Sequence, residues 1–131
     1  MSERRPTVLK IGGSIITDKT GELAARTKEI NRLTGEIQRA KVQNLIVVHG
    51  GGSFGHPIAQ KYRIKDGFKE EGQKIGFVET HHVMTVLNGL LMDELVWHGV
   101  PAVSITPSSC IITKNGRIQN FEGNTLKALL K

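Results

Sequence analysis

Two glycine-rich segments carry the residue types in this chain that are best suited to chemistry. The first is residues 9–14 (LKIGGS) and the second is residues 49–56 (HGGGSFGH). Glycine lets the backbone turn sharply and approach a ligand closely, and backbone N–H groups exposed in this way bind phosphate oxygens. Lys10, Lys19 and His56 accompany the two turns. This combination indicates phosphoryl chemistry more strongly than a single glycine loop would.

The second turn also matches the pattern G-x-G-x-x-G at Gly50, Gly52 and Gly55, which alone is weak evidence. The dinucleotide-binding form needs an acidic residue at the end of the next strand, whereas Glu70 and Glu71 fall in a polar stretch. A tight turn that simply requires glycine is the structural alternative. Three consecutive glycines exceed that need, because each costs about 0.5–1 kcal/mol of extra chain entropy, so we favour a ligand-binding role.

The charged residues each have two interpretations. Because proline is favoured at the first position of a helix, a helix beginning at Pro57 would place His56 at an N-terminus where anions bind; the alternative is a surface histidine. Lys10 interrupts an apolar strand, where a buried lysine is costly unless paired. It either reaches solvent from an edge or points over the turn at a phosphoryl group. Lys19 either joins it or lies in solvent, and for His49 packing and ligand contact remain equally open.

Hydrophobic spacing predicts the elements that position these residues. Apolar runs at 7–11 and 45–48 read as strands, and helical spacing of Ile30, Leu33 and Ile37 between them indicates a parallel βαβ unit. A short helix at 57–62, a polar loop at 65–73 and a long apolar helix at 77–97 follow. Next come a third strand at 102–105, a hairpin at 111–118 turning at Asn-Gly, and a helix at 125–130. The fold class is therefore α/β with a parallel sheet.

Composition excludes several classes of protein. The 131 residues carry a formal net charge of +6, but the basic residues are scattered and aromatics are only 5%, which disfavours a nucleic-acid surface. The first residues contain no apolar core of signal-peptide length, and no apolar run is long enough to span a bilayer. The single cysteine, Cys110, cannot form an intrachain disulfide. We expect a cytoplasmic protein with a small anionic ligand and neither nucleic-acid nor membrane partners. The histidines on the long helix lack metal-ligand spacing, so we expect no metal site.

Taken together, these motifs resemble the amino acid kinase superfamily. Residues 9–14 followed by Thr17-Asp18-Lys19 resemble its first strand and phosphate loop. The segment 49–56, with its final histidine, and residues 101–109 (PAVSITPSS) narrow the resemblance to the isopentenyl phosphate kinases. The resemblance implies an αβα sandwich with a parallel sheet. It also implies transfer of the γ-phosphoryl group of ATP, with Mg²⁺, to isopentenyl phosphate.

The resemblance also assigns roles to residues of this sequence. Lys10, Lys19 and His56 would be catalytic, with His56 holding the phosphate of the substrate. The remaining residues would bind substrate: the turns with backbone N–H groups and the helix with an apolar pocket for the prenyl chain. These residues are Gly12, Gly13, Ser14, Gly50, Gly51, Gly52, Gly55, Phe77, Thr80, Met84 and Leu87. Plain core packing is the alternative for each member of the helix stripe.

The resemblance covers only the amino-terminal, substrate-binding half of that fold. We therefore expect residues 1–131 to be that half, with ATP and Mg²⁺ held mostly by an absent nucleotide-binding half and the isolated chain inactive alone. Two alternatives remain: a non-catalytic module that binds a phosphorylated ligand, and a related kinase with another small acceptor, similar to the fosfomycin kinases. The apolar helix 77–97 is a candidate homodimer contact.

Overall fold

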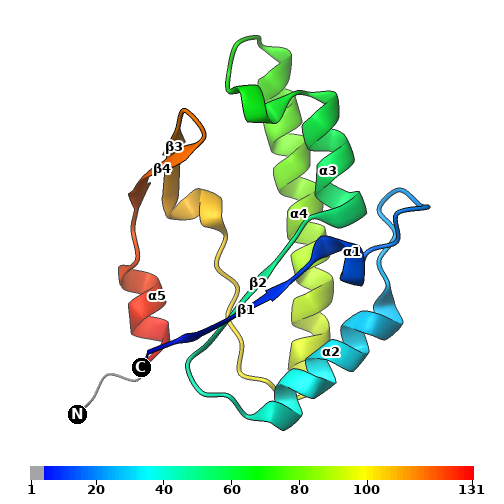
Figure 1. Ribbon diagram of the computed structural model, residues 1–131, viewed down its shortest axis with the longest axis vertical. Helices are drawn as coiled ribbons and strands as arrows, with labels where there is room; N and C mark the ends of the chain where they lie inside the picture. The colour runs from blue at the N-terminus through cyan, green and yellow to red at the C-terminus, as the bar shows by residue number, and fades with distance from the viewer. Residues whose placement is uncertain (1–4) are drawn as a thin grey trace.

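The computed structural model describes residues 5–131, which form a body of sheet and helices followed by a separate arm (Figure 1). In chain order the elements are β1 (Thr7–Ile11), α1 (Gly13–Ile16), α2 (Thr27–Ala40), β2 (Leu45–His49), α3 (Gly52–Lys61), η1 (Ile64–Asp66), α4 (Gly72–Trp97), η2 (Pro107–Ser109), β3 (Ile111–Lys114), β4 (Arg117–Phe121) and α5 (Asn124–Leu129). The elements η1 and η2 are short 3₁₀ helices.

The predicted parallel βαβ unit is confirmed. Strands β1 and β2 pair in parallel from Thr7 opposite Leu45 to Ile11 opposite His49, and α2 makes the crossover between them. Helix α2 buries Ile30 and packs Leu33 and Ile37 against the core, as the spacing predicts. Because the two strands are parallel and end in register, both glycine turns emerge at the same end of the sheet.

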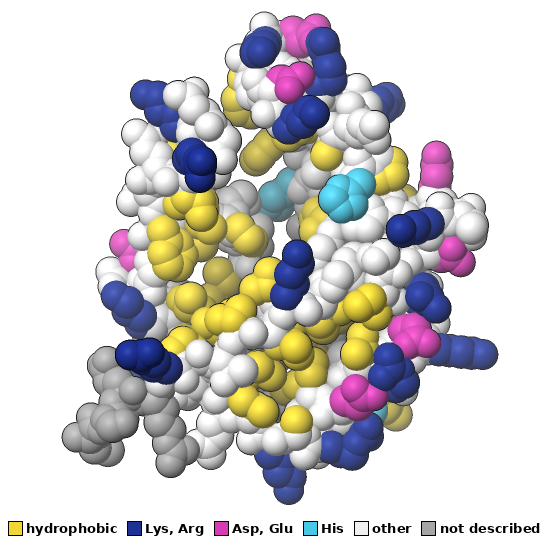
Figure 2. All heavy atoms as spheres, in the orientation of Figure 1, with side chains coloured by type: hydrophobic (Ala, Val, Ile, Leu, Met, Phe, Trp, Pro, Cys, Tyr) yellow, Lys and Arg dark blue, Asp and Glu magenta, His cyan; other side chains and the backbone are white. Residues whose placement is uncertain are grey.

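The two faces of this sheet are unlike. Ile11 and Val47 belong to the core beneath the helices. On the opposite face Val8 and Val48 are 62% and 47% exposed, and Lys10, which lies opposite Val48 on the neighbouring strand, is exposed as well. In parallel strands alternate residues share a face, which places Val8 and Lys10 on the side away from the helices. Figure 2 shows hydrophobic side chains gathered over this sheet and over the neighbouring arm.

Helix α4 forms the spine of the core. Its inward residues Val83, Leu87 and Leu91 pack with residues of β1, α1, α2 and α3 in one buried cluster. It begins before the predicted boundary, and the added first turn carries Gly76 against Tyr62. A Cβ on Gly76 would lie 2.3 Å from the Tyr62 Cβ, so glycine is what lets the two segments pack this closely.

Three local predictions are wrong. The third strand at 102–105 pairs with no strand among the described residues; its recorded anchor is a hydrogen bond from Asn88 Nδ2 to Ser104 Oγ, 2.7 Å long. Helix α3 begins at Gly52, so Pro57 lies inside it. The stretch 65–73 is not wholly a loop, because it contains part of η1 and the start of α4.

The predicted hairpin is confirmed in the arm. β3 and β4 pair antiparallel, with a register shift between Ile112 and Thr113. Asn115 and Gly116 at the turn have φ of 51° and 71°, the pair of positive values that a type I′ turn requires. Helix α5 follows at Asn124–Leu129, one residue earlier than expected. In Figure 1 the arm (orange to red) lies beside the sheet, apart from α2–α4. Within residues 5–131 no helix combines the length and hydropathy needed to cross a membrane.

The core position of Leu87 gives a test of the fold. Leu87 is fully buried, whereas its neighbour Val86 is 45% exposed. We expect Leu87→Ala to lower the free energy of unfolding by about 2–5 kcal/mol, since it removes buried methyl groups and leaves a cavity. Val86→Ala should change it by less than about 1 kcal/mol. Urea unfolding followed by circular dichroism measures both, and equal losses would contradict this packing.

Candidate phosphate-binding site

The two glycine turns touch each other through their backbones. A Cβ placed on Gly13 would lie 2.2 Å from the Gly52 nitrogen, and one on Gly50 would lie 2.7 Å from the Gly13 nitrogen. Gly52 also has φ of +48°, which side chains disfavour. The Gly50 N–H donates to the Ile11 carbonyl at 2.9 Å and completes the junction. Close packing therefore explains three of the glycines.

Two further glycines make room for a methionine. A Cβ on Gly51 or on Gly55 would come within 2.9 Å or 2.8 Å of the Met84 sulfur. Met84, a predicted pocket residue, thus lies half-buried against the first turn of α3. The flexible thioether fills the space that two absent side chains leave.

Gly12 differs from the other turn glycines. Its φ of −63° and ψ of 138° suit any residue. The nearest atom to an added Cβ is the Ile15 Cδ1 at 3.8 Å, an ordinary contact. Packing therefore gives no reason for glycine at Gly12, and close approach of a ligand remains as an explanation.

Several backbone amides at this junction donate no hydrogen bond to another described residue. Among residues 5–131, none of the recorded hydrogen bonds uses the N–H of Gly12, Gly13, Gly51 or Gly52. Gly51 and Gly52 stand at the N-terminus of α3, where the helix dipole places partial positive charge. Amides at a helix N-terminus that are not hydrogen-bonded within the protein are suited to the oxygens of a phosphate group.

The predicted cationic residues are all exposed and lie close to the two turns in the sequence. His56 is exposed and lies inside α3, not just before its first residue as expected, because the helix begins at Gly52 and not at Pro57. Lys10 is exposed on the outer face of the sheet and Lys19 is exposed in the loop after α1. No recorded ion pair in the described part of the chain involves any of the three. Ser14 is exposed at the start of α1.

The loop that carries Lys19 is fixed by its neighbour. The backbone N–H and hydroxyl of Thr20 both donate to Asp18 Oδ1, at 2.9 and 2.7 Å. These two bonds, with a smaller contribution from the charge of Arg26, hold the pKa of Asp18 below its usual range. Asp18 therefore stays a carboxylate at neutral pH.

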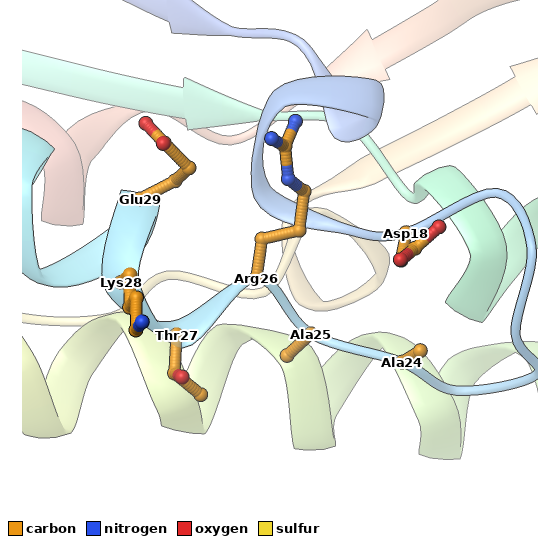
Figure 3. A pocket seen from close by; sticks show the side chains of 7 residues that line it. All are labelled: Asp18, Ala24, Ala25, Arg26, Thr27, Lys28 and Glu29. Carbon is orange, nitrogen blue, oxygen red and sulfur yellow. The ribbon is translucent and has the colours of Figure 1, made fainter.

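Asp18 and Arg26 also line an open hollow of about 370 Å³ at the start of α2 (Figure 3). The lining residues are Asp18, Ala24, Ala25, Arg26, Thr27, Lys28 and Glu29. None of them is a predicted site residue, although the Ala24 carbonyl accepts a hydrogen bond from the Ser53 hydroxyl at 3.5 Å. Across residues 5–131 no cluster of three or more His, Cys, Asp or Glu side chains is placed to hold a metal ion.

A hydrogen-bonded chain beneath the second turn went unrecognised in the sequence. His49 Nδ1 lies 3.1 Å from the Gly50 carbonyl oxygen, and its Nε2 lies 3.2 Å from Asn88 Oδ1. Asn88 then donates to Ser104. The packed interpretation of His49 is the one that the structure shows. Asn88 carried no signal, because a lone asparagine on a long helix has no distinctive spacing.

The residues predicted to line a prenyl pocket differ in exposure: Phe77 and Thr80 reach the surface, whereas Leu87 does not. Phe77 is 43% exposed and meets the Phe68 ring edge-on, with centroids 6.0 Å apart. Thr80 is half-buried, and its hydroxyl donates to the Gly76 carbonyl at 2.7 Å. Leu87 is fully buried in the core cluster. Leu87 is thus a core residue, since burial leaves it no surface for a ligand.

Comparison with known proteins identifies the family to which this chain belongs. The amino acid kinase family model matches residues 5–131. Isopentenyl phosphate kinases of Methanocaldococcus jannaschii and Methanothermobacter thermautotrophicus are 40% and 37% identical over 95% of this chain. A crystal structure of isopentenyl phosphate kinase superposes with a TM-score of 0.88 at 38% identity over 94% of this chain. The Thermoplasma acidophilum product complex gives a TM-score of 0.82 at 31% identity over 96%.

The chain belongs to the amino acid kinase family. It covers 51% and 48% of the two archaeal proteins and 52% of the first solved structure, so it spans about half their length. That the relatives are kinases implies the use of ATP.

Gly12 and Gly13 form a matched pair for testing the junction. Gly13→Ala should destabilise the chain by about 1–3 kcal/mol or more, because the methyl group overlaps the Gly52 backbone. Gly12→Ala should leave the free energy of unfolding within about 1 kcal/mol of wild type and weaken the binding of inorganic pyrophosphate. Urea unfolding and titration calorimetry make the two measurements. A stable Gly13→Ala variant would refute the backbone contact.

Proposed function

We propose that this chain is the acceptor-binding half of a kinase that converts isopentenyl phosphate to isopentenyl diphosphate. One observation carries the proposal: two glycine turns meet at one end of a parallel sheet, and four of their amides donate no hydrogen bond to another described residue. The names of the relatives at 40% and 37% identity supply the acceptor.

The reaction explains why the site is built from amides and cations. An oxygen of the acceptor phosphate attacks the γ-phosphorus of ATP, a new P–O–P bond forms, and the bond to ADP breaks. A phosphate monoester is already largely deprotonated at neutral pH, since its second pKa is near 6. The protein therefore needs no strong base. It needs positive groups that hold two anions together and stabilise the charge in transit.

The proposed roles follow the placement of each group. The amides of Gly12 and Gly13, with Lys10 and Lys19, would serve the transferring phosphoryl group. The amides of Gly51 and Gly52, together with the remaining glycines of that turn and His56, would hold the acceptor phosphate. Mg²⁺, when bound, would neutralise charge on the ATP phosphates. We propose that the groups holding the nucleotide come mostly from outside these residues.

The outer turns of α4 would receive the prenyl chain. Phe77, Thr80 and Met84 offer apolar atoms that are not fully buried, whereas Leu87 supports them from the core. A related kinase with a more polar acceptor would have little use for Phe77, which is 43% exposed. We accordingly favour a small phosphorylated isoprenoid over other acceptors, nucleic acid or a membrane as the partner.

His56 gives the direct test of acceptor binding. We expect wild type to bind isopentenyl phosphate but not isopentenol in titration calorimetry, because the phosphate supplies the charge. His56→Ala should weaken binding about tenfold or more, the usual cost of losing a hydrogen bond to a charged group. His82→Ala, at an exposed histidine on α4, is the control and should bind normally. Failure of wild type to bind, or equal effects of both substitutions, would count against the site.

We also propose that helix α4 forms the contact of a homodimer. Val78 and Val96 are 62% and 64% exposed and lie eighteen residues apart, which is five helical turns and therefore one face. We expect sedimentation velocity to show a dimer, and Val78→Glu to shift it to monomer because a buried carboxylate at the contact is costly. A wild-type monomer at high concentration would refute this contact.

A further inference from the structure

Thr17 joins the two glycine turns through its side chain. It is 1% exposed, although it follows directly on the short helix α1. Its hydroxyl donates to the Gly13 carbonyl at 2.7 Å and accepts a hydrogen bond from the Ser53 N–H at 3.0 Å. The Thr17 hydroxyl oxygen is thus hydrogen-bonded both to the first glycine turn, at Gly13, and to the start of α3, at Ser53.

The hydroxyl suits this position because it can donate and accept at once. The Ser53 N–H is one of the first donors of α3, which have no partner within their own helix. Thr17 satisfies it from another part of the chain. The hydroxyl fits only because Gly52 is glycine, since a Cβ there would lie 1.9 Å from Thr17 Oγ1.

The backbone of Thr17 is fixed from its other side. Thr17 pairs with Ala25 in an isolated antiparallel bridge. The flanking bonds run from the Asp18 N–H to the Ala24 carbonyl and from the Arg26 N–H to the Ile16 carbonyl, each 2.8 Å long. The hydroxyl therefore extends from a rigid support, as precise binding sites require.

We propose that Thr17 is a positioning residue of the phosphate site, an inference that rests on the proposed function. By holding Gly13 and Ser53 through one oxygen, it sets the spacing between the free amides of Gly12 and Gly13 and those of Gly51 and Gly52. It also turns the Ser53 N–H inward, so that the amides before it are the ones left for a ligand. Thr17 itself touches no substrate.

A second buried threonine provides a matched control. Thr34 is 0% exposed in α2, and its hydroxyl bonds to the carbonyls of Ile30 and Asn31 at 2.9 and 3.0 Å. It lies within a helix and contributes nothing to either glycine turn. Thr34→Val and Thr17→Val make the same chemical change at equal burial, so they separate a loss of stability from a loss of positioning.

The experiment measures binding of isopentenyl phosphate and of inorganic pyrophosphate by calorimetry, and hydrogen exchange of the Ser53 amide by NMR. Thr17→Val should weaken both ligands at least about tenfold and speed Ser53 exchange. Thr17→Ser, which keeps the hydroxyl, should restore both readouts to within about threefold of wild type. Thr34→Val should change neither. If Thr17→Val does not fold, Thr17→Ala takes its place, because it removes the hydroxyl without adding volume.

The outcomes distinguish the two proposals. If the wild type binds neither ligand, the proposed function is refuted, while Ser53 exchange still tests the hydrogen bond between Ser53 and the Thr17 hydroxyl. Normal binding by Thr17→Val despite fast Ser53 exchange overturns the positioning role. Equal losses of affinity in Thr17→Val and Thr34→Val, or no rescue by Thr17→Ser, overturn it as well.

Discussion

The direct backbone contact between Gly13 and Gly52 is the constraint on which the rest of the site depends. A Cβ on Gly13 would lie 2.2 Å from the Gly52 nitrogen, and one on Gly52 would lie 2.6 Å from the Gly13 carbonyl oxygen. The two segments can therefore pack this closely only because both residues are glycine. The parallel register of β1 and β2 brings the segments to the same edge, and α4 supports the second segment through Met84. Strand pairing, helix packing and glycine placement are therefore parts of one arrangement.

This contact changes the meaning of the glycines. From sequence, three consecutive glycines suggest a loop whose missing side chains leave room for a ligand. In the structure the space at Gly50 and Gly52 is occupied by the opposing turn, and the space at Gly51 by the Met84 sulfur. Their chain-entropy cost is thus offset largely by packing within the protein. The ligand would benefit indirectly, because amides held against a rigid neighbour lose little freedom when they bind.

The sequence predicts the fold better than it predicts the positions of individual side chains. Strands β1 and β2, the crossover helix, the long helix and the Asn-Gly hairpin follow from periodicity and turn chemistry, which are local. His56 was misplaced because Pro57 is a strong start signal, yet α3 begins at Gly52, where Thr17 supplies a hydrogen-bond partner from elsewhere in the chain. Residues 102–105 have the composition of a strand, but a strand also needs a neighbour. Leu87 and Phe77 share a helix stripe in sequence, and only tertiary packing separates core from surface.

The alternation of β1 argues for where a phosphate would sit. Val8 and Lys10 face away from the helices, and the extended backbone at Gly12 continues that alternation to the strand end. An added Cβ on Gly12 would meet the Ile15 side chain at an ordinary contact distance of 3.8 Å, and the amides of Gly51 and Gly52 stand at the N-terminus of α3. A phosphoryl group bound at this end of the sheet would have the exposed Lys10 of β1 and the amides at the start of α3 as positive groups nearby in the fold. In the proposed reaction the flexible lysine would follow the phosphoryl group as it moves, and the amides would hold the acceptor still, which suits transfer between two anions.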